Sequence, residues 1–485
     1  MAVVGWGGPL LFALLALSCA GAPSVHPPAP PPTTTNSSLE FWVDASRAEG
    51  GDGSQARPFR RLAPALEGSA SARLLHLAPG LYAGPFVAPD GTEVIGGDAA
   101  VLTGLLGETV LEAHGTVRLT HLLLQGGTVG LLATGALRLE GVRFSGQRTV
   151  GLHLGEGASL TAAAALFEAS VSGGVGLLLE RGTQAQLNGC TFEGPWQRAL
   201  EARAPASLRL AKSAVRGAVT ALQQSGGRAD VADVTISEGR GPGLFVAGGT
   251  LLLHRVEVRG HEYALLTGAE AVVEAEDLSS TGADRAGVAV VKAKAHFVRL
   301  SVASAGTLGG VQFLSSDVQV EGLLIREVRG IGLFMRGGSL HLDDGRIART
   351  REPDGSGGDG LQLRSGRAVL SHLTVQDASG ACLLAAEGAD VLLSQATLER
   401  CQTAGLAVET SARLWTSFVT VQSSQGPGAV ATSEGELVLR NFRALATDGV
   451  LWAECANGAQ VRTLDVAGPL PTLPCVGPLP APVAP

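Results

Sequence analysis

Apolar and polar residues recur along most of this chain in one repeating arrangement. Each unit reads Gly-Leu-x-Leu, then a turn that contains glycine, an alternating apolar strand and a second apolar strand. The 319 residues from Gly130 to Gly449 span 14 intervals, which gives about 23 residues per unit. A unit this short cannot bury its own apolar face, so it must stack on its neighbours. The first glycine of each unit, or its replacement, is Gly130, Gly151, Gly176, Ala199, Val219, Gly243, Ala264, Gly287, Gly310, Gly332, Gly360, Cys382, Gly405, Gly428 and Gly449.

A second column of residues predicts the interior of the stack. Strands of neighbouring units lie about 4.8 Å apart, so these side chains would form one continuous ladder. Before the ladder, apolar and polar residues alternate, as at Leu137, Arg138 and Leu139, which is typical of strands with one buried face. The ladder comprises Phe144, Phe167, Phe192, Val215, Ile236, Val258, Leu278, Val302, Ile325, Ile347, Val375, Leu398 and Val421.

Residues 41–82 begin the array in a different way. A strand at 41–44 and a Gly/Asp/Ser turn at 50–54 precede an amphipathic helix expected over 57–66, and a Pro-Gly-Leu-Tyr turn follows at 79–82. This order resembles the start of bacterial right-handed parallel β-helix proteins of the pectin-lyase-like superfamily. The resemblance implies that the helix caps the first coil. Leucine-rich repeats have an overlapping period, but the Asn or Cys that they require is not found consistently.

We therefore expect an all-β fold, a right-handed parallel β-helix solenoid with an N-terminal capping helix. The cap and first irregular coils would occupy 41–129, and regular coils would occupy 130–465. A Pro-rich C-terminal tail would follow at 466–485.

The N-terminus has the features of an export signal. A short apolar run predicts a signal peptide over 1–18, and Leu15-Ala16-Leu17-Ser18-Cys19 resembles a bacterial lipobox. We expect a lipid on Cys19 and a Pro/Thr-rich linker over 19–40 that holds the folded body away from a membrane. Ordinary cleavage near Ala22 is the alternative. The predicted location is the bacterial cell envelope: an outer-membrane or periplasm-facing lipoprotein, or the cell surface.

Charge excludes one class of partner. The net charge is −8, and lysine occurs only at Lys212, Lys292 and Lys294, so the sequence holds no basic stripe. Nucleic acid is therefore not an expected partner.

The cysteines suggest covalent links in an exported protein. Cys455 and Cys475 flank the last turn and the tail, and a disulfide between them would hold the terminus. Cys382 and Cys401 lie in adjoining units and could form a second bridge, although they are offset along the coil. Cys190 is expected to be a small buried residue.

The sequence contains no recognisable catalytic group. The resemblance implies that enzymes of the superfamily cluster acids on one face, often with Ca²⁺, but Glu274, Glu276 and Asp277 have no acids at equivalent positions of both neighbouring units. The histidines recur in no column that we recognise, and aromatic residues are too scattered to predict a sugar groove. We assign no catalytic residue, metal or cofactor.

One interval of irregular length offers a weaker candidate. The 28 residues from Gly332 to Gly360 include Asp343, Asp344, Glu352, Asp354 and Asp359. Acidic loops suit Ca²⁺ or a sugar. A solvated insertion, which repeat proteins tolerate, is the alternative.

The second residue after each repeat glycine should point outward, and it is often apolar. We call this set the apolar stripe, and it predicts an interaction surface: Leu132, Leu178, Phe245, Phe334, Val430 and Leu451. We therefore expect a lipid-anchored binding or scaffold module whose partner is an envelope protein or a polysaccharide. The alternative is a carbohydrate-active enzyme, a lyase, hydrolase or epimerase, that uses one face of the helix.

Overall fold

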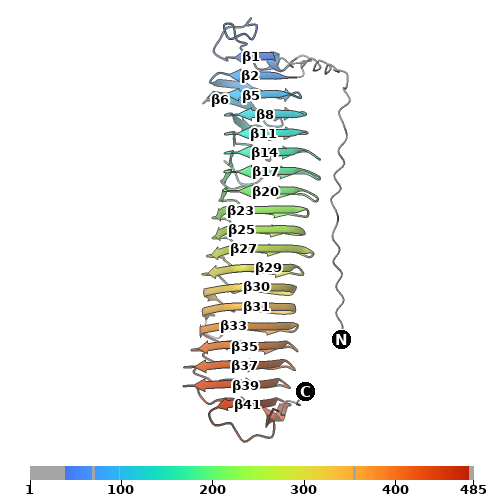
Figure 1. Cartoon of the computed structure of the whole chain (residues 1–485). Coiled ribbons are helices and arrows are strands. Elements are labelled where there is room, and N and C mark those ends of the chain that lie inside the picture. The colour runs from blue at the N-terminus through green and yellow to red at the C-terminus, as the bar shows by residue number, and fades with distance from the viewer. Residues whose placement is uncertain (1–38, 68–71, 98, 353–356, 480–485) are drawn as a thin grey trace, which may run out of the picture. The chain divides into compact units, whose positions relative to one another are not determined.

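The computed structural model describes residues 39–67, 72–97, 99–352 and 357–479. Within them, parallel strands of successive coils pair one above the next from Leu39 to Pro478 (Figure 1). The expected fold class, a right-handed parallel β-helix, is confirmed. Among the described residues, helical structure is limited to α1 (Ala63–Leu66) and the 3-10 turn η1 (Cys455–Asn457). None of the described helices is long and apolar enough to cross a membrane.

Each coil has three strands, which define three faces. The coil of β10 (Val129–Ala133), β11 (Ala136–Glu140) and β12 (Arg143–Ser145) stacks on that of β13 (Val150–Leu154), β14 (Ser159–Ala163) and β15 (Leu166–Glu168). We call these the first, second and third faces.

The remaining first-face strands are β4 (Phe86–Ala88), β7 (Thr109–Ala113), β16 (Val175–Leu179), β19 (Arg198–Ala202), β22 (Thr220–Gln224), β24 (Pro242–Val246), β26 (Tyr263–Thr267), β28 (Ala286–Val291), β32 (Leu361–Arg364), β34 (Leu383–Ala386), β36 (Leu406–Val408), β38 (Ala429–Ala431) and β40 (Leu451–Ala453). The second face begins with β1 (Leu39–Val43), β2 (Arg73–Leu77), β5 (Thr92–Gly96), β8 (Thr116–Thr120), β17 (Gln184–Asn188) and β20 (Ser207–Ala211). The third face begins with β3 (Gly80–Ala83), β6 (Ala100–Gly104), β9 (Leu123–Gly126), β18 (Thr191–Glu193) and β21 (Ala214–Arg216).

Later coils join neighbouring strands through a bend. Second and third strands are continuous in β23 (Arg228–Ser237), β25 (Gly249–Arg259), β27 (Ala271–Thr281), β29 (Lys294–Ala303), β33 (Arg367–Ala378), β35 (Asp390–Glu399), β37 (Arg413–Gln422), β39 (Glu436–Leu445) and β41 (Gln460–Ala467). All three are continuous in β30 (Val311–Arg329) and β31 (Leu333–Arg351), and β42 (Val476–Pro478) pairs with β41 at the C-terminal end.

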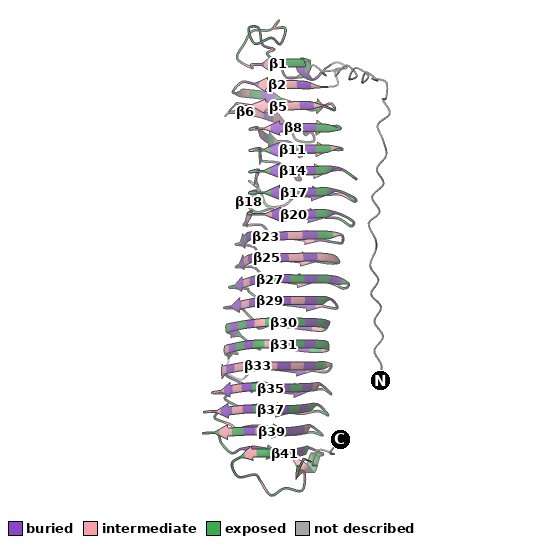
Figure 2. Ribbon diagram, in the orientation of Figure 1, coloured by how far each residue is buried: buried purple, intermediate pink, exposed green. Residues whose placement is uncertain are grey.

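Alternate residues are buried in most second-face strands, as the banding in Figure 2 shows, whereas first-face strands such as β16 and β28 bury consecutive residues. The predicted ladder lies in register through the third-face strands, and Phe144, Phe167 and Phe192 stack in it. One assignment is wrong. Leu278 pairs with Val256, and buried Ser280 stands beside Val258 in the ladder. A strand buries every second residue, so an apolar residue two places away satisfies the same pattern.

Two repeat anchors also lie elsewhere than predicted. Register places Ala221 instead of Val219, and Val450 instead of Gly449, immediately before the inward residue of the first strand. Small residues suit this position because it faces the backbone of the next coil. A Cβ on Gly151, for example, would lie 2.6 Å from the carbonyl oxygen of Gly176.

A single residue with left-handed backbone geometry turns the chain between the second and third faces in coil after coil. Gly and short polar residues tolerate this geometry best. We call this set the corner column: His121, Gly141, Ala164, Gly189, Lys212, Asp233, Arg255, Asp277, Arg299, Gly322, Asp344, His372, Gln395, Phe418, Asn441 and Asp465.

The N-terminal helix is shorter than predicted. Phe59 bridges to Val43, and the Phe59 amide donates to the Trp42 carbonyl at 2.9 Å, so this part of the chain is held beside β1 rather than in a helix. Leu62 and Leu66 are buried in the core, and the capping role of α1 stays a prediction.

Candidate functional site

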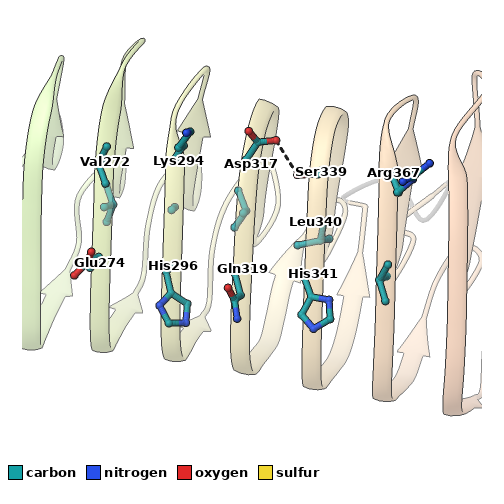
Figure 3. A pocket seen from close by; sticks show the side chains of 14 residues that line it. Val272, Glu274, Lys294, His296, Asp317, Gln319, Ser339, Leu340, His341 and Arg367 are labelled. Carbon is teal, nitrogen blue, oxygen red and sulfur yellow. Dashed lines mark hydrogen bonds between the residues drawn. The ribbon is translucent and has the colours of Figure 1, made fainter. Parts of the chain in front are cut away.

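A long groove follows the second face from β27 to β39. Two adjoining hollows of about 450 and 380 Å³, which share Arg367 and Val369, form it. One side is the outer row: Val272, Lys294, Asp317, Ser339, Arg367, Asp390, Arg413 and Glu436. The other side is the central row: Glu274, His296, Gln319, His341, Val369, Leu392 and Trp415. Figure 3 shows the two rows over the first of these hollows.

Backbone register produces both rows. Lys294 pairs with Asp317 in the outer row, and His296 pairs with Gln319 in the central row. Inward residues such as Ala295 and Val318 line the groove between the rows. The groove crosses eight strands at 4.7–4.9 Å each, which gives a length of about 34 Å. It therefore suits an extended ligand better than a compact one.

The central row changes character along its length. Its N-terminal half is polar, and its C-terminal half ends in exposed apolar groups, Leu392 at 47% and Trp415 at 45% exposure. The indole of Trp415 offers a broad apolar surface with one polar N–H. The aromatic distribution in the sequence did not predict this platform.

The groove charges nearly balance. Its lining holds three cations (Lys294, Arg367 and Arg413) and four carboxylates (Glu274, Asp317, Asp390 and Glu436). The charges alternate along the outer row, where Arg367 lies 3.6 Å from Asp390 and Arg413 lies 3.4 Å from Glu436. No part of the groove therefore presents a single sign of charge to a ligand.

A third row, the inner row, runs beside the corner column. Its acids contact residues of neighbouring coils: Glu276 lies 2.9 Å from the His254 ring and forms an ion pair with Arg299 at 2.7 Å. His296 lies 3.2 Å from Glu321. The inner row comprises Glu276, Val298, Glu321, Asp343, Ser371, Ser394, Ser417 and Arg440.

These contacts keep the carboxyls ionised. Hydrogen bonds from Arg299 lower the pKa of Glu276 and of Asp277. A hydrogen bond from Ser371 to Asp343, at 2.6 Å, and then one from His372 lower the pKa of Asp343. A general acid at neutral pH needs a raised pKa, so none of these groups is suited to be the general acid of sugar hydrolysis.

The predicted acidic loop does not form one cluster. Asp343 is bound to Ser371, and Asp344 lies on the corner column. Asp359 is half-buried, and this desolvation raises its pKa; its carboxylate accepts the Ala381 amide at 2.8 Å. Glu352 lies near Arg351 and Arg400, while Asp354 lies outside the described residues. Over the described ranges, no group of three or more His, Cys, Asp or Glu residues is placed to hold a metal ion.

Two expectations about side-chain columns need correction. His296 and His341 share the central row, two coils apart, although the sequence suggested no histidine column. The spacing hides this because their units differ in length. Leu451 is buried, and Trp452, with 51% of its surface exposed, occupies its predicted place in the apolar stripe.

The other stripe residues do share one first-face column. Leu178 is buried, whereas Leu132, Phe245, Phe334 and Val430 are partly exposed. Polar members of the same column interrupt them: His153, Glu201, Gln223, Gln312 and Gln362. Glu201 binds Arg198 at 2.5 Å and Arg203 at 3.0 Å. The stripe is therefore not a continuous apolar surface.

The cysteine pairs lie at bonding distance. The Sγ atoms of Cys382 and Cys401 are 2.05 Å apart, and those of Cys455 and Cys475 are 1.97 Å apart. Cys190 is buried and free. The signal peptide over 1–18, Cys19 and all but the last two residues of the linker lie outside the described residues.

Comparison with known proteins adds information on the fold alone. No protein family profile matches the chain, and no curated protein matches its sequence. Similar solved structures include tailspike protein 3 of bacteriophage CBA120, with 13% identity over 83% of this chain and 58% of that chain, at a TM-score of 0.28. The catalytic unit of the thermostable GH87 α-1,3-glucanase from Streptomyces thermodiastaticus strain HF3-3 shares 13% identity over 80% of this chain and 66% of that chain, at 0.33.

The PL6 family alginate lyase AlyGC is also similar, with 10% identity over 88% of this chain and 92% of that chain, at a TM-score of 0.26. The present chain thus spans less than two thirds of the tailspike and of the glucanase unit.

Proposed function

We propose that this protein is a non-catalytic binding module for an extended, uncharged polysaccharide, which lies along the second-face groove. The central observation is the line of groups that ends at Leu392 and Trp415. Sugar rings have apolar faces that pack on such surfaces, and their hydroxyls hydrogen-bond to groups such as Gln319 and His341. The coil spacing is close to the length of one pyranose unit in an extended chain, so successive coils can meet successive sugars.

The balance of charges selects the class of polysaccharide. Alginate or pectate carries a charge on each unit and would need a row of cations. In the groove, each cation of the outer row has a carboxylate on an adjacent coil: Lys294 beside Asp317, Arg367 beside Asp390 and Arg413 beside Glu436. A neutral polymer avoids the repulsion from the carboxylates, and its binding should depend only weakly on salt.

Binding without cleavage agrees with the ionised carboxyls. Glu276, Asp277 and Asp343 are held by Arg299, Ser371 and His372, so their protons are lost well below neutral pH. The alternative, a lyase, hydrolase or epimerase, needs an acid or base whose pKa is tuned near the working pH.

The proposed setting is the bacterial envelope. The apolar run before Cys19 and the Pro/Thr-rich segment after it motivate a lipid-anchored, exported protein. A Cys19→Ala variant should leave the detergent phase, and mass spectrometry of the wild type should find an acylated Cys19 at the mature N-terminus. A mature chain that starts at Ser24 or later and carries no lipid would remove the anchor.

Affinity electrophoresis of the full chain through neutral and anionic polysaccharides tests the binding function. We expect retardation by at least one neutral polymer and none by alginate or pectate. Trp415→Ala should weaken the interaction about tenfold, because a few aromatic anchors carry most of the binding energy in such contacts. Trp452→Ala is the matched control, since this tryptophan is equally exposed but lies on the first face. Equal retardation of Trp415→Ala and wild type would contradict the proposal.

A further inference from the structure

Phe418 occupies a position where the fold disfavours it. It turns the corner between the second and third faces with φ of 55°, and 62% of its surface is exposed. The left-handed region is unfavourable for a bulky side chain. Every other member of the corner column is Gly, Ala or a polar residue, including Gln395 before it and Asn441 after it. The Phe418 ring therefore imposes backbone strain that burial of the side chain does not offset.

Nothing in the packing accounts for this ring. Phe418 points away from the core, and it makes no aromatic contact among the described residues. It also lies outside the groove lining, which ends on this strand at Trp415. A strained and largely exposed side chain with no aromatic partner among the described residues points to a role in binding.

The surroundings of Phe418 indicate what it could bind. Thr416, which points inward, and Ser417 lie between it and Trp415 on β37, so the two aromatic residues are at most about 11 Å apart along the backbone. Ser417 is half-buried, whereas both aromatics are exposed. Its hydroxyl has no hydrogen-bond partner in the described part of the chain, unlike Ser371, which donates to Asp343 at 2.6 Å.

The preceding strand repeats part of this arrangement, with polar Gln395 at the position of Phe418. Leu392, Ser394 and Gln395 of β35 pair in register with the groups around Trp415 and Ser417. The Ser394 hydroxyl lies 3.5 Å from the Leu370 carbonyl, a long contact that leaves most of its bonding capacity unused. Hydroxyls between apolar walls are the groups that a sugar ring recognises.

We propose that Trp415 and Phe418 are the walls, and Ser394 and Ser417 the base, of a subsite for a side-branch sugar of a branched neutral polysaccharide. The inference rests on the proposed function, because the backbone of that polymer lies in the groove on the opposite side of Trp415. A straight chain in the groove follows the outer and central rows and does not reach Phe418. A single sugar attached to it extends across Trp415 toward the serines.

Phe418→Asn provides a test in which stability and affinity change in opposite directions. Asn tolerates left-handed geometry and already occupies the next corner at Asn441. The variant should unfold at a higher temperature than wild type, yet bind a branched polymer five- to tenfold more weakly. Lys212→Asn is the matched control: it removes an exposed side chain from the same corner column far from the groove, and it should leave affinity unchanged.

Binding of the full chain is measured with galactomannan and linear mannan, and with branched xyloglucan and linear cello-oligosaccharides. For the pair of polymers that binds, Phe418→Asn should lower the affinity for the branched polymer and leave the affinity for the linear polymer within twofold of wild type. Equal affinity of wild type and Phe418→Asn for the branched member overturns the subsite while Trp415→Ala still tests the groove. An equal loss of affinity for the branched and the linear polymer also overturns the subsite, since Phe418 would then contact the main chain of the polysaccharide. Failure of all four ligands to bind overturns the subsite and the neutral-glycan groove together.

Discussion

The rings of Phe144 and Phe167 are parallel, with centroids 4.7 Å apart and an angle of 3° between their planes. The separation equals the spacing of paired strands, so the backbone, and not the rings, sets the distance. Phe192 continues the stack at 4.5 Å. Each ring thus fills the space between its two neighbours, and removal of the middle one leaves a cavity that neither coil can close alone.

Phe167→Ala should therefore destabilise the coils around it by about 3–5 kcal/mol, the range for buried aromatic truncations. Phe167→Leu should cost much less because it retains most of the volume. Hydrogen exchange should show the loss in β12, β15 and β18, because stability in a repeat array depends on nearest neighbours. Unchanged exchange in these strands for Phe167→Ala would contradict the stacked core.

The sequence predicted the fold because one period sets both stacking and burial. The ladder and the repeat glycines each recur about every 23 residues, and only a coil of that length keeps them in line. Assignments were wrong where a nearby residue fits the same repeat pattern equally well. Leu278 is two residues from Ser280 and faces the same side, and Gly449 lies one residue before the true position at Val450.

The candidate groove was harder to predict, because it depends on register between units of unequal length. His296 and His341 fall in one row because strand register aligns both with Gln319, which lies between them. Trp415 belongs to the same row three coils later. Sequence spacing alone gives no such alignment. Phe418 did carry a local signal, since it occupies the corner position that neighbouring units fill with Gln395 and Asn441.

Tyr82 should make the N-terminal coils sensitive to alkali. Its hydroxyl lies within hydrogen-bond distance of the carbonyls of Ala78, at 2.8 Å, and Val43, at 3.1 Å, which share its single proton, and burial raises the pKa of Tyr82 to about 12. The unfolded phenol has a pKa near 10. Stability from this group is therefore complete below pH 10 and is lost between about pH 10 and 12, as the unfolded chain ionises first.

Hydrogen exchange of β2, β3 and β5 should thus accelerate over this pH range beyond the intrinsic exchange rate. Tyr82→Phe should flatten the pH dependence, although the lost hydrogen bonds lower stability at neutral pH. Tyr263→Phe is the control, because it lies in a distant coil and should leave the N-terminal profile unchanged. If hydrogen exchange in Tyr82→Phe depended on pH as steeply as in the wild type, another group would be responsible for the loss of stability.

The Cys455–Cys475 disulfide should hold the last strand on the stack. β42 makes a short pairing with β41 through Val461 and Val476, and Val476 is only partly buried against the core. Reduction, or the double substitution Cys455→Ser and Cys475→Ser, should release β42 to proteolysis while β39 stays protected. Cys190→Ala is the control for loss of a thiol. Protection of β42 in the reduced protein would mean that pairing alone secures the strand.

The last prediction concerns catalysis. Full-length protein should not depolymerise pectate, alginate or the neutral glycan that it binds, with or without Ca²⁺. The reason is the protonation state of three acids on the inner row and the corner column: Arg299 lowers the pKa of Glu276 and Asp277, and Ser371 lowers that of Asp343, so none of the three can donate a proton near neutral pH. Reducing-end and unsaturated-product assays, run from pH 4 to pH 9, measure cleavage. Arg299→Gln, which removes the largest cause of the lowered pKa of both carboxyls, should remain inactive, because the two acids belong to one strand and do not flank the groove as a cleavage pair. Cleavage that disappears in Asp343→Asn would instead establish the enzyme.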